Sequence, residues 1–164
     1  MDSKKEFIVF TDGSAILNGK KNCKSSSATV WPNGEFPDQA FYLNPGSTRS
    51  NNRAEYFAII CAYKQADKLD PLREKSLHIF TDCNLAIQTC TLWMKSWEKK
   101  GWKKSTPGEI KNLDLVKTLY EYYNKRTTLF THVKAHTGKN DFNSIWNDRV
   151  DKVAYDAVSK DILI

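Results

Sequence analysis

The order of strand-like and helix-like segments restricts the possible folds of this chain more than any other feature of its sequence. Five segments are rich in β-branched and aromatic residues or alternate apolar with polar residues, which predicts β-strands. They are residues 6–11, 27–31, 39–43, 75–81 and 127–133. Five other segments carry apolar residues at helical spacing. They are residues 51–69, 84–89, 92–99, about 110–125 and 143–158.

The resulting order is three strands, a helix, a strand, three helices, a strand and a final helix. Turn residues such as Asn18 and Gly19 link the first three strands, which predicts an antiparallel meander. Ser50 or Asn51 can cap the first helix, and Pro71 ends that region. Such elements bury their apolar faces in a mixed sheet covered by helices. The sequence therefore predicts an α/β fold with a five-stranded mixed sheet, antiparallel in its first three strands and then parallel, flanked by helices.

Four carboxylates stand where these strands end or these helices begin. Asp12 and Asp82 follow the first and fourth predicted strands, Glu55 lies one turn into the first helix, and Asp151 lies on the last helix. A right-handed crossover makes the first and fourth strands parallel neighbours, and ligand sites gather at the carboxyl ends of parallel strands. A carboxylate beside a buried strand is costly to desolvate unless a positive charge pairs with it. We therefore expect the four acids to share a cation.

The types of ligand indicate which cation this is. The four cysteines form no Cys-x-x-Cys pair, which argues against a zinc site, and histidine is marginal in the cluster. Clustered carboxylates are hard oxygen ligands that suit Mg²⁺, with Mn²⁺ able to substitute. Two such ions about 4 Å apart would clamp a phosphodiester. The pattern predicts a site for two Mg²⁺ ions.

Size and charge set the context of the chain. We expect 164 residues to form a single domain over residues 1–164, either as a separate protein or excised from a longer one. The sequence lacks a long apolar run and a signal peptide, so we expect an intracellular protein without a membrane partner. Nothing in the sequence demands a dimer, so we expect a monomer. The net charge of +6 favours a polyanionic partner. Five lysines and two tryptophans are interleaved in residues 95–104.

Several motifs occur together and in order along nearly the whole chain. They are Thr11-Asp12-Gly13-Ser14, Asn51-Asn52-Arg53-Ala54-Glu55, Thr81-Asp82, His132-Val133-Lys134-Ala135-His136-Thr137-Gly138 and Asn147-Asp148-Arg149-Val150-Asp151. In this order and spacing they resemble type 1 ribonuclease H. The resemblance implies the ribonuclease H-like fold and endonucleolytic cleavage of the RNA strand in RNA–DNA hybrids. The products would carry 3′-hydroxyl and 5′-phosphate ends.

The resemblance also implies catalytic roles. Asp12 would bridge both metal ions, Asp151 would complete the metal that activates water, and Glu55 and Asp82 would complete the other. His136 matches a mobile histidine that helps proton transfer or product release. It lies in a loop whose neighbours, Ala135 and Thr137-Gly138, favour flexibility.

Contacts to the hybrid follow from the same resemblance. Asn51 and Asn52 would read the minor groove, where 2′-hydroxyls distinguish RNA from DNA. Asn84 would contact the RNA strand, and Ser50 would contact a DNA phosphate. A basic protrusion would grip the DNA strand through phosphate contacts that weaken with salt. Its candidate residues are Trp97, Lys99, Lys100, Trp102 and Lys103.

Simpler interpretations remain open for individual residues. Trp31, Trp93 and Trp146 are more often core residues than nucleic-acid platforms. Trp97 and Trp102 can either brace the basic element or touch sugar. His78 and His132 are expected in packing positions within strands.

Three departures from the family pattern bear on the site. Residues 15–21 replace a Gly/Pro-rich tract, Cys83 stands where many relatives have serine, and the segment from His136 to Asp151 is long.

Two rival functions also remain. One is a binding module for hybrids or duplexes without catalysis, and the other is a resolvase or integrase core, which would need a different acid pattern and lacks the Asn51-Asn52 pair.

Overall fold

A five-stranded mixed sheet forms the centre of the computed structural model, which describes residues 5–16, 23–43 and 50–163. The strands are β1 (Glu6–Ile16), β2 (Lys24–Val30), β3 (Gln39–Phe41), β4 (Ser76–Thr81) and β5 (Thr128–His132). Their order in the sheet is β3-β2-β1-β4-β5. The pairs β1–β2 and β2–β3 are antiparallel, whereas β1–β4 and β4–β5 are parallel. The predicted fold class is confirmed.

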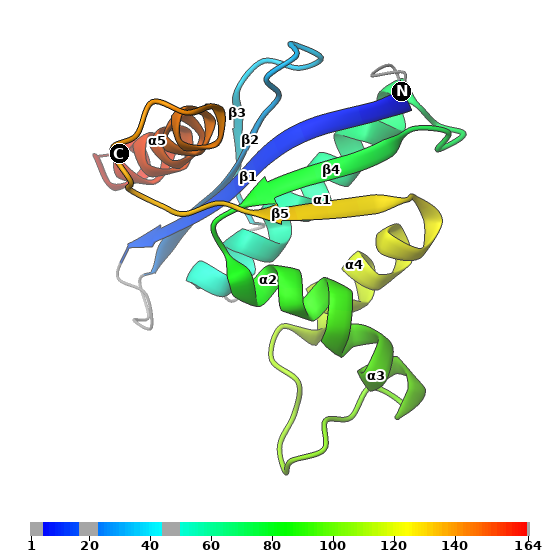
Figure 1. The fold of residues 1–164 in the computed structure, drawn as a ribbon. Helices are drawn as coiled ribbons and strands as arrows, with labels where there is room; N and C mark the ends of the chain where they lie inside the picture. Colours follow the sequence, from blue (N-terminus) through cyan, green and yellow to red (C-terminus); the bar gives the residue numbers. More distant parts are fainter. Residues whose placement is uncertain (1–4, 17–22, 44–49, 164) are drawn as a thin grey trace.

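Helices cover both faces of this sheet (Figure 1). They are α1 (Asn51–Leu69), α2 (Asn84–Gln88), the π-helical turn η2 (Thr89–Trp93), α3 (Met94–Lys99), α4 (Leu113–Lys125) and α5 (Phe142–Leu163). Helix α1 packs on β1 and β2 from one side, and α4 packs against α1; α5 packs on the same two strands from the other side. Helix α3 and the loop after it project away from the sheet (Figure 1).

The alternation of side chains along β1 explains the two apolar layers. Phe7 and Val9 point to the α1 side and join one buried cluster, whereas Ile8 and Phe10 point to the α5 side and join the other. Successive side chains of a strand point to opposite faces, so a central strand covered on both sides is apolar at almost every position. This arrangement places β1 between α1 and α5, which carry two of the four acids.

The element boundaries differ from the sequence predictions in two informative places. Strand β1 continues to Ile16, because β2 supplies backbone partners as far as the Ile16–Lys24 pair. The predicted helices 84–89 and 92–99 form one helical run, which the π-turn η2 joins. The predicted turn at Asn18 and Gly19 lies outside the described residues. Among the described residues, no helix is long and apolar enough to span a membrane.

Candidate active site

Three of the four predicted acids converge at one point of the sheet. Asp12, Glu55 and Asp82 each place one carboxylate oxygen within 4.8 Å of the others. Asp82 directly follows β4, as predicted. The sequence predicted that Asp12 would follow the end of its strand, but Asp12 lies inside β1. It is two residues past Phe10, which forms the last parallel pair with Phe80 of β4. Beyond that pair β1 is bonded to β2 alone, so Asp12 faces the space where β4 has ended.

Gly13 brings Glu55 to this point through a close approach between β1 and α1. Its backbone N–H donates a hydrogen bond to Oε1 of Glu55. A Cβ atom at Gly13 would lie 2.5 Å from the backbone carbon of Ala54 and from the backbone nitrogen of Glu55. From β2, the Ser27 hydroxyl donates to the Ala54 carbonyl at 2.6 Å. The sequence motif included Gly13, but sequence reasoning gave it no role, because the need for glycine comes from a neighbour 42 residues away.

The cluster is electrostatically unfavourable without a cation. Burial raises the pKa of Asp12 well above its ordinary value, and the nearby charges of Glu55 and Asp82 add to this. Burial likewise raises the pKa of Glu55 to about 7, despite its hydrogen bonds from Asp12 and Gly13. Burial is also the main cause that raises the pKa of Asp82. Three carboxylates can therefore be ionised together at neutral pH only at a high free-energy cost.

The donor atoms fit a hard divalent cation. Oδ2 of Asp12 is buried, and no donor among the described residues hydrogen-bonds to it. The neighbouring atoms that could bind a metal are carboxylate oxygens of Glu55 and Asp82, and such oxygens prefer Mg²⁺ or Mn²⁺. An unpaired buried anion is costly, and a metal ion among these oxygens would remove that cost. The arrangement can hold such an ion and expose it to a phosphate group.

Asp151 and His136 lie at the margin of the three-acid cluster. Asp151 is half-buried on α5 and close enough to Asp12 that contact between the two side chains raises the pKa of Asp12. Its carboxylate is not one of the three whose oxygens lie within 4.8 Å of one another. His136 is exposed and has a φ of 54°. It lies near enough to Asp82 to favour the ionised form of the Asp82 carboxylate. The structure thus brings all five predicted catalytic residues to one region, three of them in direct juxtaposition.

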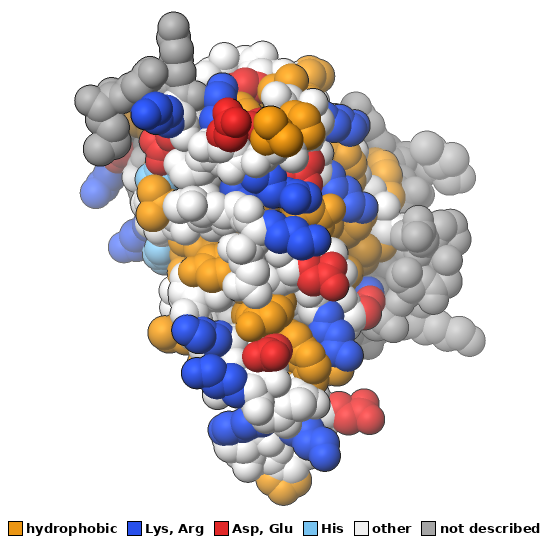
Figure 2. Space-filling model, turned by 90° about the vertical axis from the view of Figure 1, so that its right-hand side faces the viewer, with side chains coloured by type: hydrophobic (Ala, Val, Ile, Leu, Met, Phe, Trp, Pro, Cys, Tyr) orange, Lys and Arg blue, Asp and Glu red, His pale blue; other side chains and the backbone are white. Residues whose placement is uncertain are grey.

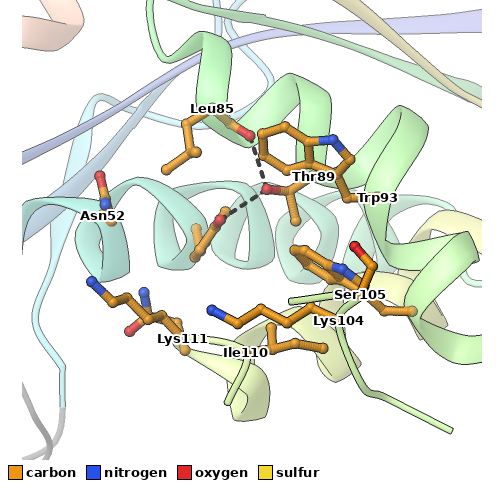
Figure 3. A pocket seen from close by; sticks show the side chains of 11 residues that line it. Asn52, Leu85, Thr89, Trp93, Lys104, Ser105, Ile110 and Lys111 are labelled. Carbon is orange, nitrogen blue, oxygen red and sulfur yellow. Dashed lines mark hydrogen bonds between the residues drawn. The ribbon is translucent and has the colours of Figure 1, made fainter. Parts of the chain in front are cut away.

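A pocket of about 390 Å³ lies between the start of α1 and the projecting α3 region. Figure 3 shows Lys104 and Lys111 on one side of it and Trp93 and Leu85 on the other. Two predicted residues, Asn52 and Trp97, line it, together with Asn112. Trp93, which the sequence favours as a core residue, is half-buried and lines the pocket beside Trp97, with ring centroids 6.1 Å apart.

Lys104 belongs to the basic segment that the family resemblance assigns to the DNA strand, whereas the sequence indicated no site role for Lys111 or Asn112. Lys111 and Asn112 lie outside that segment, and only the fold places them beside Asn52. The buried Arg53 fixes this side of the pocket, because its guanidinium binds both carboxylate oxygens of Asp114 at 2.8 Å and Oδ1 of Asn112 at 3.3 Å.

The other predicted substrate residues occupy different positions. Ser50 caps α1, since its hydroxyl accepts from the backbone of Arg53 at 3.2 Å. Asn51 and Asn84 are exposed at the starts of α1 and α2. Trp102 is not among the residues that line the 390 Å³ pocket; its ring packs edge-on against Tyr120 with centroids 5.4 Å apart.

The predicted basic side chains lie on the projecting region. The exposed ones are Lys99, Lys100 and Lys103. Lys and Arg side chains gather on both flanks of this lower projection, with few acids between them (Figure 2). A polyanion can therefore approach the projection from more than one side.

Comparisons with known proteins agree with this geometry. The RNase H family model matches residues 4–159. The chain is 30% identical over 143 residues to the probable ribonuclease H of Acanthamoeba polyphaga mimivirus, covering 87% of this chain and 62% of that protein. It is 31% identical over 130 residues to the ribonuclease H of Schizosaccharomyces pombe, covering 79% of this chain and 46% of that protein. The chain thus spans less than two thirds of the length of either relative.

A solved structure extends the likeness to the fold. LC11-RNase H1 in complex with an RNA/DNA hybrid superposes with a TM-score of 0.62 at 18% identity, covering 95% of this chain and 99% of that one. The trio of Asp12, Glu55 and Asp82 resembles the active site of such enzymes. Since the family model matches the chain from residue 4 to residue 159, this protein belongs to the RNase H family.

Proposed function

We propose that this protein is an endoribonuclease that cleaves the RNA strand of RNA–DNA hybrids by metal-dependent hydrolysis. Water would add to the scissile phosphorus, and the 3′ oxygen would leave, so the products carry 5′-phosphate and 3′-hydroxyl ends. The observation that carries this proposal is the trio of Asp12, Glu55 and Asp82, of which the first two are buried and the third is half-buried, with an oxygen of Asp12 that no described donor satisfies. Family membership indicates the class of substrate.

The side chains would share the work as follows. Asp12, Glu55 and Asp82 would hold two Mg²⁺ ions, with Asp151 completing the site from α5. When bound, these ions supply Lewis acidity that activates water and stabilises the leaving oxygen. Gly13 keeps the Glu55 carboxylate in place through its backbone N–H. His136, on an exposed turn beside Asp82, would carry a proton to the leaving group or help release the product.

The projecting region would hold the DNA strand of the hybrid. The pocket that Asn52, Trp93 and Trp97 line offers two aromatic rings for sugar contact and the Lys104 and Lys111 side chains for phosphate. It begins at the first turn of α1, which also carries Glu55, so a strand bound there would lie beside the cluster. The structurally similar LC11-RNase H1 was solved with an RNA/DNA hybrid, which supports this class of substrate.

The direct test is a digest of an end-labelled RNA–DNA hybrid with Mg²⁺, comparing the wild type with Asp82→Asn and Asp151→Asn. We expect the wild type to cut only the RNA strand. Asp82→Asn should lose nearly all activity, because it removes a ligand of the central trio. Asp151→Asn should retain more, because Asp151 lies outside that trio.

A substrate panel separates the rival functions. Hybrid, double-stranded RNA and double-stranded DNA are each incubated with Mg²⁺, with Mn²⁺ and with EDTA. Binding of the hybrid without cleavage under any of these conditions would identify a binding module instead. Preferential cleavage of double-stranded DNA would indicate a resolvase- or integrase-like nuclease.

A further inference from the structure

Asn147 is a buried amide on α5 that lies against the acidic cluster. Asn147 is 1% exposed. Its Nδ2 donates a hydrogen bond to Oδ2 of Asp82 at 3.3 Å, although the two residues are 65 positions apart in the sequence. It precedes Asp151 by four residues on α5, so both side chains lie on the same face of the helix. The helix therefore presents a carboxylate to Asp12 within β1 and an amide to Asp82 at the end of β4.

The carbonyl oxygen of the Asn147 amide, Oδ1, makes no hydrogen bond with the described residues. This oxygen is also buried. Buried side-chain oxygens in folded proteins nearly always accept a hydrogen bond, from protein or from bound water. Four side-chain oxygens among the described residues are buried without a hydrogen-bond partner, and two of them, Oδ1 of Asn147 and Oδ2 of Asp12, belong to residues at the acidic cluster.

We propose that Asn147 is a positioning residue for the metal site, an inference that rests on the proposed function. Its amide N–H holds one oxygen of Asp82, which leaves the other oxygen of Asp82 for the side shared with Asp12 and Glu55. Its unsatisfied Oδ1 accepts a hydrogen bond from an O–H group that enters with the cation, namely a water ligand. Asn147 would thus orient the Asp82 carboxylate and a water molecule at the site through the hydrogen bonds of its own amide.

Partners of this kind govern affinity because they restrict the orientation of the groups that bind the ion. A carboxylate that is free to rotate must be ordered when the metal binds, whereas one already held by an amide is preorganised. Loss of such a partner lowers metal affinity or activity about 10- to 100-fold in known metal sites. A purely structural amide would instead affect unfolding and leave the metal affinity unchanged.

The test uses the metal alone as the probe. Mn²⁺ binding to the metal-stripped wild type, Asn147→Leu and Asn147→Ala is measured by calorimetry, and thermal unfolding is recorded in EDTA. Leucine keeps the branched shape of asparagine without its hydrogen-bonding groups, whereas alanine leaves a cavity, so a loss of Mn²⁺ affinity common to both variants follows from the missing amide. Asp148→Ala, at the adjacent exposed position, is the matched control.

We expect Asn147→Leu to unfold close to the wild-type temperature and to bind Mn²⁺ about 10-fold more weakly. The Mg²⁺ concentration for half-maximal hybrid cleavage should rise by a similar factor, while Asp148→Ala matches the wild type. Unchanged Mn²⁺ affinity in both Asn147 variants would overturn the inference and leave the proposed function intact. A wild type that binds no Mn²⁺ would overturn the metal site itself, and with it both proposals.

Discussion

At the scale of single residues, the free energy of the site depends on how the protein tolerates several buried acids at once. Glu55 is 6% exposed and Asp12 is 3% exposed, so neither carboxylate is well hydrated. The hydrogen bond from Gly13 to Glu55 and that from Asn147 to Asp82 offset only part of this cost. The protein without metal therefore carries stored electrostatic free energy that a bound cation would release.

This stored free energy predicts a pH dependence of stability in EDTA. The pKa of Glu55 rises from 4.5 to about 7 on folding, so between these pH values the folded state binds more protons than the unfolded state. Stability must then fall as pH rises from 4.5 to about 7, by about 3 kcal/mol for a shift of this size. Thermal unfolding of wild type and Glu55→Gln from pH 4.5 to 8 measures the effect. We expect the substitution to flatten the decline, and parallel pH profiles would contradict this explanation.

A second prediction at this scale concerns Gly13. In Gly13→Ala, the new methyl group would lie 2.5 Å from backbone atoms of Ala54 and Glu55, so α1 must move away from β1. A displacement on the order of 1 Å at a catalytic group can lower the rate about 100-fold, which is the loss we expect in hybrid cleavage. The double variant with Ala54→Gly should not recover, because the nearest atoms belong to the backbone. Recovery would show that the Ala54 side chain was the obstacle.

At the scale of elements, the π-turn η2 decides which side chains of the second helical run reach the pocket. Leu85, Thr89, Trp93 and Trp97 are spaced four apart and all line it. In a uniform α-helix, residues four apart drift by about 40° per step, so Leu85 and Trp97 would diverge by about 120°. A π-turn rotates less per residue and offsets this drift. The Thr89 hydroxyl fixes the turn by donating to Leu85 O and bonding Tyr56, each at 2.9 Å (Figure 3).

The projecting element should supply salt-sensitive affinity for the hybrid. In an Asp82→Asn background that prevents cleavage, Lys99→Ala, Lys100→Ala and Lys103→Ala are combined. We expect weaker binding and a plot of log affinity against log salt that is shallower by about 3, since each of the three lost phosphate contacts removes close to one unit of slope. The control removes three other lysines, Lys64 and Lys68 on α1 and Lys125 on α4, which are all exposed. Equal slopes for the two combinations would show that overall charge, rather than the projection, attracts the hybrid.

At the scale of the whole molecule, one buried arginine joins the helical layer to the edge of the sheet. Arg126 precedes β5, and its side chain is 1% exposed. It binds Asp67 at 2.8 Å and Asp70 at 2.6 Å near the end of α1, and it also donates to the carbonyls of Lys75 and Asp70. The network lies at the end of α1 opposite Glu55, so it stabilises the frame that orients the site.

This network predicts a large effect on stability with a small effect on chemistry. Arg126→Met should lower the free energy of unfolding by about 3 kcal/mol, because it leaves Asp67 and Asp70 without their buried partner. Urea denaturation measures this, with the exposed Lys125→Met as the control. Cleavage at temperatures where the variant stays folded should remain near the wild-type rate. A selective loss of activity at full stability would show that Arg126 serves the site more directly.

The sequence by itself determined the types and order of the elements and the identity of the acids. Apolar periodicity predicted the strands and helices because it reflects which side chains must be buried in each kind of element. The motifs pointed to Asp12, Glu55, Asp82, Asp151 and His136. The predictions failed where local patterns were weak: residues 13–16 contain glycine and serine, yet pairing with β2 extends β1 through them.

Only the tertiary structure decided the contacts that make the acids a site. The close approach of Gly13 to α1, the amide of Asn147 on Asp82, and the meeting of Asn52 with Lys104 and Lys111 join residues far apart in sequence. Such contacts depend on strand register and helix packing. Local propensities describe the conformation of each segment and carry no distance between segments, so packing alone set these positions.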